Sequence, residues 1–116
     1  MAAAQDNGRQ SFAMSPVRLT FSERLDLHNA MAELGAHQRS LDATGQHSQA
    51  TAVPESIVAD LSNLREVDTA ALAVLLQLDR ETRRRFGKPL VIESAPRQLR
   101  ALAELTSVDR LMTWQA

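Results

Sequence analysis

The run from Ala70 to Leu76, AALAVLL, constrains the fold more than any other part of the chain. It follows an acid and a hydroxyl residue, Asp68 and Thr69, and it precedes a polar stretch that ends at Gly87. Helical residues advance about 100° each, so a helix through this run is apolar on every side. One sheet cannot cover such a helix, so the remaining apolar surface must be covered either by another element of the chain or by a partner.

The residues that flank this run predict the ends of a long helix. Asp68 or Thr69 can accept hydrogen bonds from the first amide groups of a helix, which lack partners within it. Gly87 suits the left-handed position just past a helix end. Helix capping, worth about 1 kcal/mol, explains the polar pair. The functional alternative is that Thr69 is phosphorylated, so that the phosphoryl group meets free amides while Asp68 repels its charge.

Three other segments have the patterns of buried or half-buried strands. They are VRLTF at residues 17–21, SIVADLS at residues 56–62 and PLVIE at residues 89–93. Two more segments have helical spacing. One is placed to be capped by Asp26 and has an apolar stripe of Leu27, Ala30, Met31, Leu34 and Leu41, and the other follows Pro96. Alternating strands and helices predict an α/β fold, with a small and mainly parallel sheet covered by helices.

The remaining segments give the expected domain organisation. Residues 1–11 are small and polar without periodicity, which predicts a disordered tail. Residues 42–55 collect Gly, Ser, Thr and Gln without an apolar period, which predicts a long mobile loop. With 116 residues in all, we expect one domain over residues 12–116.

Composition excludes several classes of function. The net charge is −1 and the aromatic residues are three Phe and one Trp, which disfavours nucleic-acid binding. The longest apolar run is far shorter than the roughly 20 residues that cross a bilayer. The chain contains no cysteine and shows no secretory signal, so we expect a cytoplasmic protein.

The chain also lacks the usual marks of catalysis. The histidines at positions 28, 37 and 47 do not have metal-ligand spacing, and we find neither a phosphate-binding loop nor an activated nucleophile. We therefore expect no enzymatic activity, no metal and no cofactor. The basic cluster RETRRRFGK at residues 80–88 is explained by the negative end of the helix dipole. Contact with a phosphate or an acidic partner is the alternative.

Two stretches resemble a known family. ADLSNLREVDTAALAVLLQL and GKPLVIESAPRQLRALAEL are similar to the STAS domain of anti-sigma-factor antagonists, sulfate-transporter tails and a subunit of the Mla phospholipid-transport ABC system. The resemblance covers residues 57–112 well and residues 12–41 more loosely. The element Val-Asp-Thr opening a helix with LAVLL is its most specific part, and the chain looks most like the MlaB-type subunit.

The resemblance implies a partner-binding surface rather than an active site. It implies that Thr69 is the regulatory hydroxyl and that its helix meets the partner. The partner would be an ABC transporter ATPase subunit, which would hold the protein at the inner membrane only indirectly, or alternatively an anti-sigma kinase. Where the family usually has Gly, this chain has Ala71. The expected partner-binding residues are Asp68, Thr69, Ala70, Ala71, Ala73 and Val74.

Overall fold

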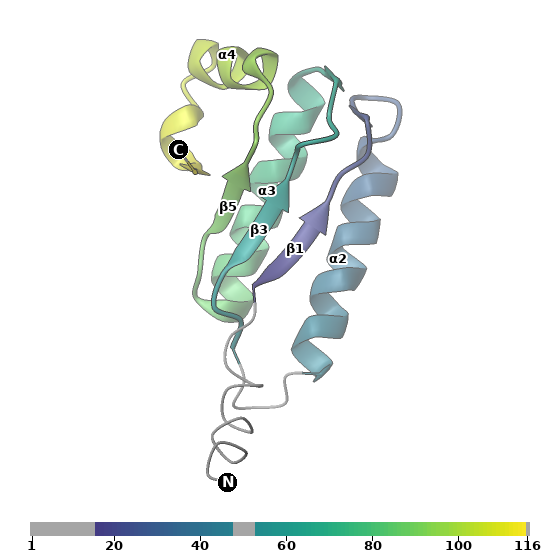
Figure 1. Cartoon of the computed structure of the whole chain (residues 1–116), viewed down its shortest axis with the longest axis vertical. Coiled ribbons are helices and arrows are strands. Elements are labelled where there is room, and N and C mark those ends of the chain that lie inside the picture. The colour runs from purple at the N-terminus through teal and green to yellow at the C-terminus, as the bar shows by residue number, and fades with distance from the viewer. Residues whose placement is uncertain (1–15, 48–52, 116) are drawn as a thin grey trace, which may run out of the picture.

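A computed structural model of the chain describes residues 16–47 and 53–115 (Figure 1). Its elements, in chain order, are β1 (Val17–Thr20), β2 (Arg24–Leu25), α2 (Ala30–His47), β3 (Ile57–Asp60), β4 (Glu66–Val67), α3 (Thr69–Phe86), β5 (Leu90–Glu93), α4 (Arg97–Leu105), the 3₁₀ turn η1 (Asp109–Leu111) and β6 (Thr113–Trp114). No helix in these described ranges is both long and apolar enough to span a membrane.

Four strands form one parallel sheet in the order β1-β3-β5-β6. Helices α2 and α3 lie side by side against one face of this sheet, and α4 lies beyond the carboxyl ends of its strands (Figure 1). The expected α/β fold is therefore confirmed. The sequence did not predict β6, nor the second sheet, in which β2 and β4 pair in parallel.

The two faces of the main sheet differ because side chains alternate along each strand. Leu19, Ala59 and Ile92 stand in register and are buried beneath the helices. They belong to one continuous hydrophobic core that also contains most of the inward side of α3. Burial of these aliphatic groups is the main force that holds the helices on the sheet.

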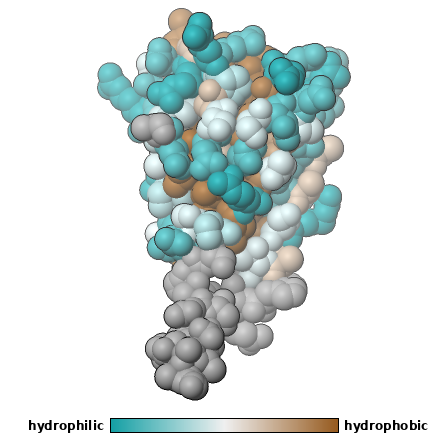
Figure 2. Space-filling model, viewed as in Figure 1, coloured by the Kyte–Doolittle hydropathy of each residue, from teal (hydrophilic) through white to brown (hydrophobic). Residues whose placement is uncertain are grey.

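The opposite face carries a charged ladder across three strands. The Arg18 guanidinium on β1 donates to Glu93 on β5 at 2.8 Å and to Asp60 on β3 at 3.3 Å. Figure 2 views this face and shows hydrophobic surface between hydrophilic groups. Hydrogen bonding from Ser62 lowers the pKa of the Asp60 carboxyl, with a smaller contribution from Arg18.

Helix α3 has the ends that its sequence predicts. Asp68 is the N-cap, and Gly87 follows the last turn with φ 71°, the left-handed conformation that glycine adopts without strain. Asp79, in the middle of the helix, accepts a hydrogen bond from the backbone N–H of Leu90 at 3.0 Å. This bond fixes α3 to the start of β5, so both ends and the middle of the helix are held by specific contacts.

Helix α2 differs from its prediction at both ends. It begins at Ala30 rather than directly after Asp26, and it continues to His47, so residues 42–47 are helical and not part of a loop. Two contacts explain the extension. Asp42 forms an ion pair with Arg85 of α3, and the Thr44 hydroxyl donates to the carbonyl of Ser40 at 2.9 Å. Residues 53–55 of the expected loop are in neither helix nor strand, whereas its residues 48–52 and the expected tail at residues 1–11 lie outside the described residues.

Candidate partner-binding surface

The Asp68 carboxylate joins two chain segments at the start of α3. Its Oδ1 accepts from the backbone N–H of Ala70 at 2.8 Å, which caps the helix. Its Oδ2 accepts from the backbone N–H of Leu27 at 3.1 Å, which lies in the connection between β2 and α2. The Asp68 side chain therefore pairs with a free amide at the start of α3 and also positions the segment that leads into α2.

That segment is held by its own polar groups. The Asp26 carboxylate accepts from the N–H of His28 at 2.9 Å and pairs with the Arg24 guanidinium at 2.8 Å. Asn29 accepts from the N–H of Asp26 at 2.9 Å and donates to the carbonyl of Arg24 at 2.8 Å. These bonds form a tight turn before the helix, and the turn directs the Leu27 side chain outward, where it is 76% exposed.

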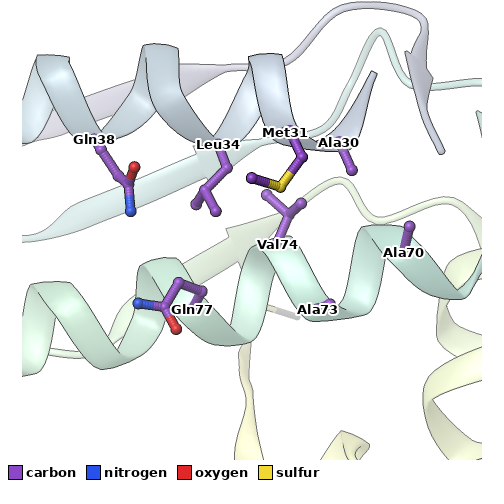
Figure 3. Close-up of a pocket in the computed structure, with 8 residues that line it drawn as sticks. All are labelled: Ala30, Met31, Leu34, Gln38, Ala70, Ala73, Val74 and Gln77. Carbon is purple, nitrogen blue, oxygen red and sulfur yellow. The ribbon is translucent and has the colours of Figure 1, made fainter. Parts of the chain in front are cut away.

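A groove of about 370 Å³ runs along the seam between α2 and α3. Figure 3 shows Met31 of α2 and Val74 of α3 pointing toward each other across the seam, with Leu34 beside them and two glutamines at one end. The lining residues are Ala30, Met31, Leu34, Gln38, Ala70, Ala73, Val74 and Gln77. Small side chains at Ala30, Ala70 and Ala73 leave the groove open, so its shape follows directly from the alanines of the sequence.

Buried polar contacts close the groove at its glutamine end. The Glu81 carboxylate, 3% exposed, accepts from Gln38 at 2.6 Å and from Gln77 at 3.1 Å. Arg85 donates to Glu81 at 3.2 Å and also pairs with Asp42. Burial alone would raise the pKa of Glu81, but these hydrogen bonds and the Arg85 charge outweigh it and lower the pKa. The network ties α2 to α3 and so fixes the width of the groove.

The predicted site residues fall into three groups. Thr69 and Ala73 are exposed, and Asp68 and Ala70 are partly exposed beside them. Val74 is 3% exposed but lines the groove. Ala71 has no exposed surface and packs in the core, so its side chain supports the helix from within and does not face a partner.

Two exposed apolar residues at the site were misread in the sequence. Leu27 and Met31 were expected on the inward stripe of the first helix, but they are 76% and 79% exposed. Helical spacing gave no sign of this, because Leu27 precedes the helix and Met31 belongs to the side that faces the groove. Together with Ala70 and Ala73 they form an apolar surface next to the Thr69 hydroxyl. From here on, the name α2–α3 seam means this apolar surface and the groove together.

Two of the amides at the start of α3 that a phosphoryl group on Thr69 could reach already have partners. The N–H of Ala70 donates to the Asp68 side chain, and the N–H of Ala71 donates to the Asp68 carbonyl at 3.0 Å. A phosphoryl group at Thr69 would therefore point outward beside a carboxylate. Its added charge and size would alter the rim of the seam and would not strengthen the start of the helix.

The sequence was compared with models of known protein families. A family model described as "Mlab, STAS domain" matches residues 9–113. The chain belongs to the MlaB-type STAS family. No curated protein matches it. STAS domains are generally non-catalytic regulatory domains, which fits a site built from an apolar groove, a hydroxyl and helix-capping groups.

Proposed function

We propose that this STAS domain is the regulatory subunit of an Mla-type phospholipid-transport ABC system and that it binds the ATPase subunit through the α2–α3 seam. It would lie on the cytoplasmic side of the inner membrane, held there by the complex, and support the transport that maintains outer-membrane lipid asymmetry. The protein itself would catalyse no reaction. The alternative partner, an anti-sigma kinase, would use the same hydroxyl and the same helix.

One observation carries the proposal: an exposed hydroxyl, Thr69, stands at the rim of an open apolar groove. Leu27 and Met31, both more than three-quarters exposed, extend the apolar surface beyond the groove itself. Large exposed aliphatic side chains grouped around a groove are typical of protein-binding surfaces. The MlaB-type family match directs the choice of partner toward an ABC ATPase.

Docking can regulate an ATPase without chemistry in the docked subunit. A ligand that binds one of two conformations more tightly shifts the population toward that conformation. The seam is well suited to this because Glu81 and Asp68 hold its two helices in a fixed relation. The STAS domain would thus be a rigid binding partner that stabilises the conformation of the ATPase that is competent for ATP hydrolysis.

Substitution of Thr69 tests the docking surface. Thr69→Glu places a second carboxylate beside Asp68 and enlarges a small side chain at the rim, so we expect at least about tenfold weaker binding of the Mla ATPase by calorimetry. The fold should be retained, because an acid in the first turn of a helix is stabilising by about 0.3–1 kcal/mol.

Thr69→Ser is the matched control, because it keeps the hydroxyl and should bind nearly as the natural protein does. Thermal melts of both variants separate loss of binding from loss of stability. Wild-type affinity in Thr69→Glu would show that Thr69 is only part of the helix start and that the docking surface lies elsewhere.

Affinity purification from native cells identifies the partner. Recovery of an ABC ATPase supports the proposal, and recovery of a serine kinase supports the partner-switch alternative. Recovery of neither class from cells that express the protein would refute both.

A further inference from the structure

We propose that the partner segment seated in the α2–α3 seam is an amphipathic helix, with an apolar stripe in the groove and acidic residues that pair with Arg80 and Arg84. This inference rests on the proposed docking function and specifies the chemistry of the segment that docks. It follows from the polarity of the outward side of α3, which changes along the helix.

The outward side of α3 is a single line of residues. With about 100° per residue, Thr69, Ala73, Arg80 and Arg84 fall within an arc of about 60° around the helix. All four are exposed. The line therefore begins with a hydroxyl and a methyl group beside the groove, and it ends with two arginines whose Cα atoms lie about 10 Å and 16 Å beyond that of Ala73 along the helix axis.

In the part of the chain that the structure describes, Arg80 and Arg84 are the arginines of the basic cluster whose guanidinium groups face outward without an ion-pair partner. Arg83 pairs with Asp79 at 2.9 Å, and Arg85 pairs with Glu81 and Asp42. Within the described ranges, neither Arg80 nor Arg84 has a hydrogen bond or an ion pair. The helix dipole favours cations near a helix C-terminus, but that does not require two of them to face outward in line with an apolar groove.

A helix fits this surface better than an extended segment does. The seam lies between two parallel helices and presents ridges of side chains, into which the ridges of a third helix can pack. It offers no strand edge with unpaired backbone groups, which an added strand would need. The apolar lining from Ala30 to Gln38 spans about 12 Å, or roughly two helical turns, which matches apolar residues at positions i, i+3, i+4 and i+7 of a bound helix.

The charges of Arg80 and Arg84 determine which residues the partner helix needs beyond its apolar stripe. A helix whose apolar stripe fills the groove would have to present residues about two to three turns further along to Arg80 and Arg84. Carboxylates at those positions gain two ion pairs, whereas basic residues would be repelled. Two guanidinium groups next to an apolar groove, on a chain of net charge −1, do not make a nucleic-acid surface.

Charge reversal tests the inference. The Arg80→Glu, Arg84→Glu double variant should bind the Mla ATPase about tenfold more weakly at low salt, and the difference should shrink at 0.5 M salt because exposed pairs are screened. The control is Arg97→Glu with Arg110→Glu, which changes net charge equally at exposed positions on α4 and η1. Equal weakening of both double variants would overturn the specific pairing.

Cross-linking identifies the seated segment. A photoreactive residue introduced at position 73, which is exposed at the groove, should capture one helical segment of the ATPase with the apolar spacing and the acidic residues described above. Reversing those acids to arginine should restore binding to the Arg80→Glu, Arg84→Glu variant. Capture of a segment without acids, of an extended segment or of a second copy of this chain would overturn the inference.

The two levels of proposal fail differently. If the wild-type protein binds the ATPase but charge reversal has no effect and the captured segment lacks acids, the amphipathic-helix inference is wrong and the docking function stands. If the wild-type protein does not bind the ATPase at all, the docking function is wrong, and the helix inference fails with it.

Discussion

Replacing Asp68 should loosen two segments at once, because its two oxygens serve two different backbone amides. Asp68→Ala removes the cap on Ala70, which costs about 1 kcal/mol, and the hydrogen bond from Leu27, which costs about 0.5–1.5 kcal/mol. The expected loss is therefore about 1.5–2.5 kcal/mol of the free energy of unfolding. For a domain of this size that corresponds to a fall in Tm of about 6–11 °C.

Asp68→Ser separates the two contributions. Serine is as good an N-cap as aspartate, but its single oxygen cannot serve Ala70 and Leu27 together. We expect its stability to lie between those of the natural protein and Asp68→Ala. Urea denaturation measures both variants, and amide exchange by NMR should show faster exchange of the Leu27 N–H in each.

The same measurements can refute this reasoning. Equal stability of Asp68→Ser and the natural protein, with unchanged exchange at Leu27, would mean that the bond to the β2–α2 connection contributes nothing. Stability of Asp68→Ala within about 0.5 kcal/mol of the natural protein would remove the capping argument as well.

Further predictions concern the backbone of the helices and a buried histidine. Gly35→Ala should stabilise the protein by about 0.5–1 kcal/mol in urea denaturation, since an added Cβ meets only the flexible end of Arg39 at 3.5 Å, whereas Gly87→Ala should destabilise it by about 1 kcal/mol because φ is positive there. His37 packs against Phe21 with its Nε2 buried and 3.6 Å from Glu33, too far for a hydrogen bond. Burial lowers its pKa more than Glu33 raises it, so the fold favours the neutral ring, and stability that is complete above pH 6.5 should be lost progressively as pH falls below that value. His37→Gln should flatten the dependence of stability on pH below pH 6.5, and an unchanged slope in that variant would contradict the assignment.

Local chemical signals explain which parts of the fold were predictable. Helix α3 was predicted to within one residue because Asp68 and Gly87 are specific to helix ends, and because the segment between them is strongly patterned. The four-residue strands were predictable from their β-branched and alternating residues. Strands β2, β4 and β6 have two residues each, too few for any period to be recognised.

Contacts between distant segments explain what was missed. Residues 42–47 have no apolar period, and their helical state is supported by the pair between Asp42 and Arg85, 43 positions away. Likewise the cap at Asp68 was predictable, because capping chemistry is local, whereas the part of Thr69 in partner binding stays a prediction. Leu27 and Met31 could not be assigned to it, because only the packing of α2 against α3 decides which side of each helix remains open.

The strand order β1-β3-β5-β6 has a consequence for how fast the chain folds. Val17 pairs with Ile57, and Ile57 pairs with Leu90. The paired strands of the main sheet are therefore far apart in sequence, and none of them can pair through a short hairpin turn. Each pairing must first close a loop that contains a helix, and the entropy of that closure is lost before any ladder bond forms. Folding should therefore begin with the packing of β3 and β5 against helix α3, and β1 should pair with β3 late. The whole domain should fold more slowly than a helical bundle of equal length.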